Sequence, residues 1–352
     1  MTRTDDDSST FSRRSVLTLL ASSALAGAAL PAFAAEKPEL SAIEIGGNRD
    51  PQLGAQIIVA HLKGYFKEEG VDVTVRWTDT SGDLLPLMAS GSINLAGLGM
   101  ANIANLIARG VPAKAISALC DYSGTQALVL RPGLKLNDPK DLAGRKFAAP
   151  TTSPHEVAIA ELGQRYGFDA STVTLARMQP SEGVVAAARG DVDGVLTYPP
   201  FLGRILDMGG TLYFTGSATY FDGKETPLAT KDRLLNIRSI LAGNETWMKA
   251  NPNTTFAVLR AVARANGFIA ANLDETSKML ASFLKSTPEV MLQSLKANVY
   301  SLAMDEGLLG SITFTSGWLQ KIGQLKAPID PAKTLDTSFL AKFDPKLVSI
   351  TV

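Results

Sequence analysis

The chain has few of the residues on which most redox and catalytic sites depend, with one cysteine and two histidines among 352 residues. A single cysteine, Cys120, excludes an intrachain disulfide, so packing alone must stabilise the fold. Cys120 follows an apolar run, residues 115–119, and has no histidine near it in the sequence. These surroundings favour a small buried side chain over a nucleophile. His61 and His155 are too far apart in the sequence to predict a metal site, and we expect neither a metal nor a cofactor.

An excess of charge of either sign is also absent. Acidic and basic residues number 34 each, and the chain carries no basic block. This balance argues against nucleic acid or an anionic membrane surface as a partner. The motifs HExxH and GxSxG, the Walker loop and the dinucleotide-binding glycine fingerprint are all missing. His155 follows Ser153-Pro154 and could act as a base or contact a ligand. We predict no catalytic residue and expect a binding protein rather than an enzyme.

The first residues have the features of an export signal. A twin-arginine sequence at residues 12–17 (SRRSVL) precedes an apolar run that ends at Leu30, and residues 32–34 (AFA) form a small-x-small cleavage pattern. We predict a Tat-type signal peptide over residues 1–34, cleaved after Ala34, and a periplasmic mature protein. An uncleaved signal anchor is the alternative, which Pro31 disfavours. No later segment reaches the roughly 18 apolar residues of a membrane span.

After residue 35, short apolar runs alternate with helical patterns, which predicts an α/β fold with two lobes, each built on a mainly parallel sheet. Residues 35–127 form the first part of lobe 1, residues 128–235 form lobe 2, and residues 236–352 return to lobe 1. The expected strands cover residues 42–45, 72–76, 95–98, 115–119, 128–130, 146–149, 173–177, 194–198 and 237–242. The expected helices cover residues 52–63, 84–89, 101–108, 155–166, 182–189, 254–272 and 275–284, with a short turn or helix at residues 138–142 and a loop at residues 221–235.

Ligands of open parallel sheets bind where the carboxyl ends of strands meet helix starts. Serine, threonine and glycine recur in the loops at those positions, and the free N–H groups there suit an oxyanion. Such residues also cap helices everywhere, so each loop alone is weak evidence. The expected ligand-binding residues are Asn48, Arg49, Gln52, Thr80, Ser81, Gly82, Gly99, Met100, Tyr122, Ser123, Thr152, Ser153, His155 and Tyr198. Tyr198 precedes Pro199-Pro200 at the end of its strand and should face lobe 1.

Four segments carry a resemblance to a known family. Residues 60–73 (AHLKGYFKEEGVDV), 87–95 (LMASGSINL), 138–147 (DPKDLAGRKF) and 179–200 occur in the order found in solute-binding proteins of nitrate, sulfonate and taurine (NitT/TauT) ABC importers. Asn94 stands where that family usually has aspartate. The similarity spans nearly all of residues 41–290. It implies a type II periplasmic binding fold, in which two lobes close on one ligand. The missing catalytic motifs agree with this resemblance.

The resemblance also implies partners: an ABC permease driven by a cytoplasmic ATPase, with the binding protein expected to be a monomer. Arg49 is the expected charged anchor, because guanidinium pairs bidentately with sulfonate or carboxylate. Asp121, if it points inward, would repel a simple anion and suit an amino group, while Tyr122 and Tyr198 could pack on an organic body. The other interpretation leaves Arg49 and Asp121 as solvated loop charges.

We therefore expect a small organic sulfonate or carboxylate, zwitterions included, in preference to bare nitrate or bicarbonate. Neutral or heterocyclic, pyrimidine-like ligands form the alternative class. A pyrimidine-synthesising branch of the same fold uses histidine and a cysteine-rich iron segment, and the single cysteine argues against it. A sensor or chaperone-like binding protein would share every feature given so far.

Overall fold

The computed structural model describes residues 36–150 and 154–352. The predicted signal peptide and its cleavage point after Ala34 lie outside these residues, as do Thr152 and Ser153. Within the described part, no helix combines the length and apolarity that a membrane crossing requires.

A six-stranded sheet, sheet A, draws its strands from two separate parts of the chain. Its order is β13-β4-β12-β3-β1-β2. The strands are β1 (Ala42–Asn48), β2 (Asp72–Thr78), β3 (Leu95–Gly99), β4 (Ala113–Asp121), β12 (Arg238–Asn244) and β13 (Val299–Tyr300). β1 pairs in parallel with β2 and β3, whereas β12 lies antiparallel between β3 and β4.

A seven-stranded sheet, sheet B, is formed by the intervening part of the chain. Its order is β11-β10-β9-β5-β8-β6-β7. The strands are β5 (Ala127–Leu130), β6 (Lys146–Ala149), β7 (Thr174–Arg177), β8 (Gly194–Thr197), β9 (Thr211–Thr215), β10 (Ala218–Thr219) and β11 (Thr226–Pro227). β6 pairs in parallel with β7 and β8, whereas β5 lies antiparallel between β8 and β9.

The two sheets share one strand order. Sheet A contains β2-β1-β3-β12-β4 and sheet B contains β7-β6-β8-β5-β9. In each sheet the fourth strand of this series runs against its neighbours, and it is the strand that follows a passage from the other sheet. The predicted α/β fold is therefore confirmed, but the expected mainly parallel pairing is wrong. Each sheet has two parallel pairs between its strands, and its other pairs are antiparallel. The lobe boundaries at residues 127/128 and 235/236 stay predictions; the chain changes sheets between β4 and β5 and between β11 and β12.

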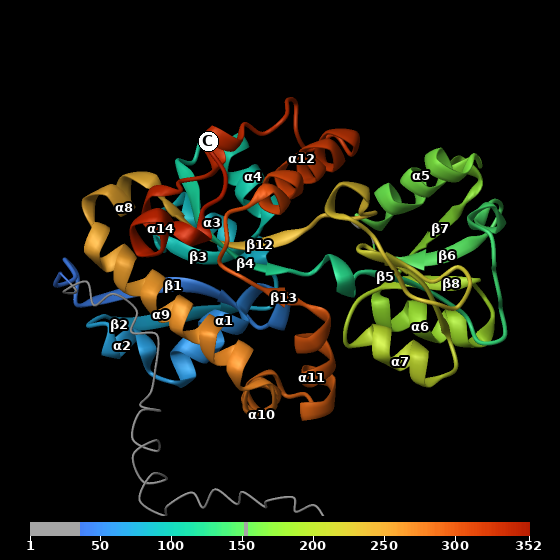
Figure 1. Ribbon diagram of the computed structural model, residues 1–352, viewed down its shortest axis with the longest axis horizontal. Helices are drawn as coiled ribbons and strands as arrows, with labels where there is room; N and C mark the ends of the chain where they lie inside the picture. Colours follow the sequence, from blue (N-terminus) through green and yellow to red (C-terminus); the bar gives the residue numbers. More distant parts are fainter. Residues whose placement is uncertain (1–35, 151–153) are drawn as a thin grey trace, which may run out of the picture. The chain divides into compact units, whose positions relative to one another are not determined.

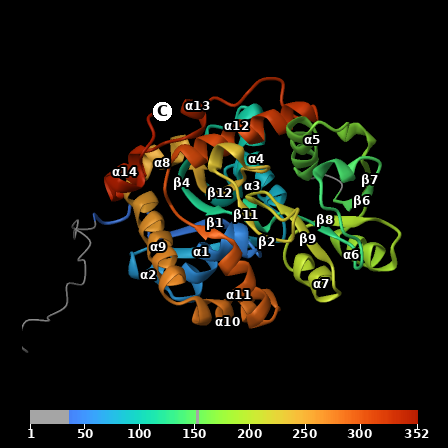
Figure 2. The same cartoon turned by 45° about the vertical axis from the view of Figure 1, so that its right-hand side comes forward.

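Helices cover the faces of both sheets (Figure 1). They are α1 (Pro51–Leu62), α2 (Tyr65–Glu68), α3 (Leu85–Ala89), α4 (Met100–Ala108), α5 (His155–Tyr166), α6 (Pro180–Arg189), α7 (Phe201–Asp207), α8 (Glu245–Ala250), α9 (Pro252–Ala271), α10 (Leu273–Leu284), α11 (Pro288–Ala297), α12 (Glu306–Lys321), α13 (Pro331–Thr334) and α14 (Ser338–Phe343). Figure 2 shows α12 beside α4, where Leu319 and Ala104 share one small apolar cluster.

Strand β5 in the middle of sheet B is apolar and buried along its whole length. Because side chains alternate across a strand, Leu128 and Leu130 of β5 face one apolar cluster and Ala127 and Val129 face another. The first cluster includes Leu162 of α5, and the second includes residues of α6 and α7. Both faces of the sheet are thus covered, as Figure 1 shows, and continuous apolar runs are the expected sequence of such strands.

Helix α1 starts at the carboxyl end of β1 and is held there by close packing. Asp50 caps it, and Pro51 occupies its first turn, where a missing N–H costs nothing. A Cβ at Gly54 would lie 2.3 Å from the carbonyl oxygen of Asn48, so only glycine allows this approach. The start of α1 is therefore fixed against the end of β1, and this junction positions the site described below.

The observed elements differ from the predicted ones mainly in number. Strand β6 and helix α5 have the predicted bounds, and the other predicted elements differ by one to three residues at one or both ends. Residues 221–235, predicted as a loop, contain the short strand β11 and a 3-10 turn at Thr230–Asp232. Helices were expected in the C-terminal part of the chain, but no bounds were predicted for strands β9, β10 and β13 or for helices α2, α7, α8 and α11 to α14. Strands β10 and β11 have only two residues each, too few for a periodic pattern.

Candidate functional site

The carboxyl ends of β1 and β3 are joined by a buried amide. Asn48 is fully buried at the end of β1. Its Nδ2 donates to the carbonyl oxygen of Gly97 at 2.7 Å, and its Oδ1 accepts from Ser81 Oγ at 2.9 Å. Asn48 and Ser81 therefore both lie at the predicted site, where they use their polar atoms to hold its loops together.

Arg49 points to an exposed partner. Its Nη1 lies 3.4 Å from Asp79 Oδ1, with 48% of the Arg49 side chain and 82% of the Asp79 side chain exposed. Such pairs contribute at most about 1 kcal/mol, so this contact leaves the guanidinium free to move. Thr80 and Gly82 are also exposed, and Thr80 Oγ1 donates to Asp83 Oδ2 at 2.9 Å. The role of Arg49 as an anion anchor stays a prediction.

Asp50, absent from the predicted site residues, carries a half-buried carboxylate at the start of α1. Its Oδ1 accepts from the backbone N–H groups of Gln52 at 2.6 Å and Leu53 at 3.0 Å. Burial raises the pKa of Asp50, although these two hydrogen bonds act in the opposite direction. The dipeptide Asp-Pro before an apolar run is a helix-start signal, and it could have identified this residue as a cap but not as a site.

A hydrogen bond between two glutamines links the start of α1 to the segment that leads into sheet B. Gln126 Nε2 donates to Gln52 Oε1 at 3.2 Å, and both side chains are buried. The carbonyl oxygen of Gln52 accepts from Ser239 Oγ at 2.7 Å. Gln52 was predicted, whereas Gln126 was not, because no local pattern marks a contact across 74 residues.

Gly99 caps α4 and leaves room for an aromatic ring. A Cβ at Gly99 would lie 3.5 Å from the hydroxyl oxygen of Tyr122 and 3.2 Å from Asn102 Oδ1. The structure thus brings two predicted residues, Gly99 and Tyr122, together, and the adjacent Met100 is buried. Burial and the negative charge of Asp50 raise the pKa of Tyr122, so its phenol is neutral.

Ser123 lies where the chain leaves sheet A, and its polar atoms join the two passages between the sheets. Its Oγ accepts from the Ile237 N–H at 3.0 Å, and its carbonyl oxygen accepts from the Gly216 N–H at 3.0 Å. Ser123 is fully buried. These contacts give it a structural function at the base of the predicted hinge.

Two predicted residues, His155 and Tyr198, come from sheet B. Tyr198 directly follows β8, its ring meets that of Phe201 edge-on at 6.0 Å, and it is half-buried. Burial and the charge of Asp50 raise the pKa of Tyr198, so the two side chains lie within electrostatic reach although they belong to different sheets. His155 is buried at the start of α5. Burial lowers its pKa to about 4, although a hydrogen bond with the Thr197 backbone acts in the opposite direction.

Asp121 does not stand free. It is 9% exposed and forms ion pairs with Arg233 Nη1 and, at 3.7 Å, with Arg238 Nε. Arg238 also pairs with Asp305 at 2.6 Å. The interpretation of Asp121 as a solvated loop charge is therefore wrong, because Arg233 and Arg238 pair with it. No sequence pattern connects Asp121 to Arg233.

The Cys120 thiol and possible metal ligands are the remaining groups that could take part in catalysis. Cys120 is fully buried, as predicted, and burial together with the charges of Asp121 and Asp50 raises the pKa of its thiol well above the usual range. Burial and the raised pKa both disfavour the reactive thiolate at neutral pH. Within residues 36–150 and 154–352, no group of three or more histidine, cysteine or acidic side chains could hold a metal ion.

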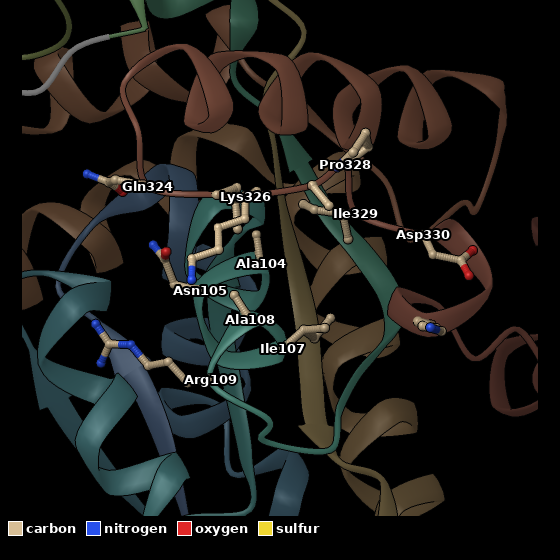
Figure 3. A pocket seen from close by; sticks show the side chains of 13 residues that line it. Ala104, Asn105, Ile107, Ala108, Arg109, Gln324, Lys326, Pro328, Ile329 and Asp330 are labelled. Carbon is tan, nitrogen blue, oxygen red and sulfur yellow. The ribbon is translucent and has the colours of Figure 1, made fainter.

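A cavity of about 700 Å³ lies away from these residues, between the second half of α4 and residues 324–333. Figure 3 shows Asn105, Ile107 and Arg109 of α4 on one side and Lys326, Ile329 and Asp330 on the other. Because α4 begins at the carboxyl end of β3, its second half lies toward the opposite end of the sheet. The cavity is therefore separate from the candidate site.

Comparison with known proteins shows the family of this chain. The NMT1/THI5-like family model matches residues 54–276, more than half of the chain, and the chain belongs to this family. A taurine-binding periplasmic protein of Escherichia coli is 25% identical over 148 residues, which cover 42% of this chain and 46% of that protein. A putative binding protein of Brucella abortus is 23% identical, covering 78% of this chain and 83% of its own length.

An enzyme also occurs among the relatives. A 4-amino-5-hydroxymethyl-2-methylpyrimidine phosphate synthase of Aspergillus parasiticus is 25% identical over 62% of this chain and 63% of its own length. Among solved structures, the sulfonate-binding protein SsuA of Methylobacillus flagellatus has a TM-score of 0.70 at 16% identity, covering 88% of this chain and 95% of that one. SsuA of Escherichia coli has a TM-score of 0.69 at 14% identity, covering 84% and 92%. These structures share the periplasmic binding protein fold.

Proposed function

We propose that the chain is the extracytoplasmic solute-binding component of an ABC importer. It is exported by the twin-arginine route and cleaved after Ala34. It binds one small solute as a monomer in the periplasm and delivers it to a permease that is driven by a cytoplasmic ATPase. The ligand-binding residues are those predicted from the sequence, together with Asp50 and Gln126.

The observation that carries this proposal is the convergence of polar side chains from both sheets at the start of α1. Gln126, which leads into sheet B, donates to Gln52 of α1, and Tyr198 of sheet B lies within the field of Asp50. A ligand held by residues from both sheets binds better to a closed arrangement than to an open one. That difference in affinity is what trapping by closure requires.

The solute is a small organic sulfonate or carboxylate, zwitterions included. Family membership and the taurine-binding relative support this class. Backbone N–H groups at the start of α4, beside Gly99, supply donors for the acid group, because no side chain caps that helix. Tyr122 and Tyr198 supply aromatic surface for the organic part.

A pyrimidine synthase is the second candidate, because three relatives are named as such an enzyme. Among the described residues, few side chains are suited to catalyse this synthesis. Cys120 is buried with a raised thiol pKa, and His155 is buried with its pKa lowered to about 4. A sensory role would use the same site as transport and differs only in the partner that receives the signal.

Thermal unfolding of the purified full chain with single solutes tests the proposal. The panel contains taurine, alkanesulfonates, carboxylates, nitrate, bicarbonate and pyrimidines. A true ligand at 100 times its dissociation constant should raise the free energy of unfolding by about 2.7 kcal/mol without being consumed. Consumption of a stabilising solute would instead support the synthase, and stabilisation by no solute would contradict a binding function.

A further inference from the structure

The carboxylate of Asp50 has one oxygen engaged and one available. Oδ1 caps α1 by accepting from two backbone N–H groups. Oδ2 accepts no hydrogen bond from any side chain or backbone group in residues 36–150 and 154–352. Asp50 therefore caps the helix with Oδ1 and presents Oδ2 as a second acceptor beside the helix start.

This carboxylate also lacks a counter-charge within the described part of the chain. Its neighbour Arg49 turns to Asp79, while Arg233 and Arg238 bind Asp121 and Asp305. The causes that shift the pKa of Asp50 are burial and two backbone hydrogen bonds, and no cation is among them. A partly buried carboxylate without a cation is costly, which makes a cationic ligand a natural partner.

Three tyrosines from separate parts of the chain lie within electrostatic reach of this charge. The field of Asp50 contributes to the raised pKa of Tyr122, Tyr198 and Tyr300. Tyr300 donates its hydroxyl to the carbonyl oxygen of Pro51 at 2.9 Å, which fixes its ring at the start of α1. The hydroxyls of Tyr122 and Tyr198 make no hydrogen bond to the described residues. Aromatic faces next to a carboxylate favour organic cations.

Two buried acceptors beside these tyrosines have no partner among the described residues. Asn298 Oδ1 is one, and the amide nitrogen of the same side chain donates to the Tyr300 hydroxyl at 3.4 Å. Thr197 Oγ1, in the residue before Tyr198, is the other. Both side chains are more than nine-tenths buried. The Asn298 amide oxygen can only accept and calls for a ligand that donates hydrogen bonds, whereas the Thr197 hydroxyl can donate or accept. An ammonium group has three donors.

We propose that the solute carries a positively charged nitrogen, which binds Asp50 Oδ2 between the rings of Tyr122 and Tyr198. This inference rests on the proposed function and narrows it to amino-bearing zwitterions. The acid group of the same molecule binds the N–H donors of the neighbouring loops. Nitrate, bicarbonate and unsubstituted alkanesulfonates lack the ammonium group that Asp50 selects.

Titration calorimetry with matched solute pairs tests this selection. Taurine is compared with 2-hydroxyethanesulfonate, and β-alanine with 3-hydroxypropionate, because each pair differs only in amine against hydroxyl. The wild-type protein should bind the amine of at least one pair at least tenfold more tightly than its hydroxyl analogue. The variant Asp50→Asn keeps a side chain that caps helices equally well and removes the charge. It should lose at least tenfold in affinity for the amine and leave the hydroxyl analogue unchanged or bound more tightly.

Asp330→Asn is the matched control, because Asp330 also precedes a proline and caps a helix, α13, by accepting from the Ala332 N–H at 3.0 Å. It should bind like wild type. Equal binding of both members of each pair, or an Asp50→Asn variant that keeps its amine affinity, would overturn the inference and leave the binding function standing. Absence of heat with all four solutes and no stabilisation by the wider panel would contradict both.

Discussion

His155 is the residue whose burial has the clearest consequence for stability. Its imidazole is buried at the start of α5, and its pKa falls from 6.5 to about 4, mainly because burial disfavours the charged form. The folded protein therefore keeps His155 neutral at pH values where the unfolded chain takes up a proton. The stabilisation is fully present above pH 6.5 and is lost progressively as the pH falls toward 4.

We predict that protonation of this single group in the unfolded chain lowers the free energy of unfolding by about 3 kcal/mol as the pH falls from 7 to 4. Urea denaturation of wild type and His155→Gln at several pH values measures the effect. The variant should be less stable than wild type at pH 7, and its free energy of unfolding should fall less steeply with acidification. Parallel pH profiles of the two proteins would show that His155 does not titrate in this way.

At the scale of elements, the junction of β1 and α1 determines where the helix start lies. Gly54 permits the approach of α1 to the Asn48 carbonyl, at which any Cβ would be 2.3 Å away. We predict that Gly54→Ala lowers the free energy of unfolding by at least about 2 kcal/mol, because backbone must move to admit the methyl group. Denaturant unfolding measures the change.

The matched control is Gly267→Ala within helix α9, where a Cβ would meet nothing within 4 Å. There alanine should stabilise the protein by about 0.5–1 kcal/mol through its higher helix propensity. Equal effects of the two substitutions would contradict the packing argument at Gly54.

Elements with strong local signals were predictable from the sequence, and their partners were not. Helix α5 has its predicted bounds because Pro154 precedes it and Gly167, in a left-handed conformation, ends it. Strand β10 has two residues and no pattern of its own. At the site, the loops after β1, β3 and β8 followed from the α/β pattern. The contacts of Tyr300 with Pro51 and of Gln126 with Gln52 join residues distant in sequence, so only the folded chain reveals them.

At the scale of the whole described chain, charged side chains connect the two passages between the sheets. Arg233, just before β12, binds Asp121 at the end of β4, and both side chains are largely buried. We predict that Arg233→Ala lowers the free energy of unfolding by about 2–4 kcal/mol, because it removes one partner of a buried charge. The control Arg76→Ala breaks the exposed pair with Glu44 and should cost less than about 1 kcal/mol. Denaturant titration of both variants measures the difference, and similar small losses would contradict the buried network.

The central claim is that one small solute is held by side chains from both sheets. Calorimetric titration of wild type and Tyr198→Ala with a solute that stabilises the protein tests it most directly, because Tyr198 belongs to sheet B and Asp50 to sheet A. The account predicts one solute per chain, an affinity at least tenfold weaker in Tyr198→Ala, and a free energy of unfolding without solute changed by less than about 1 kcal/mol. Unchanged affinity in Tyr198→Ala would contradict the claim, since the solute would then bind without sheet B.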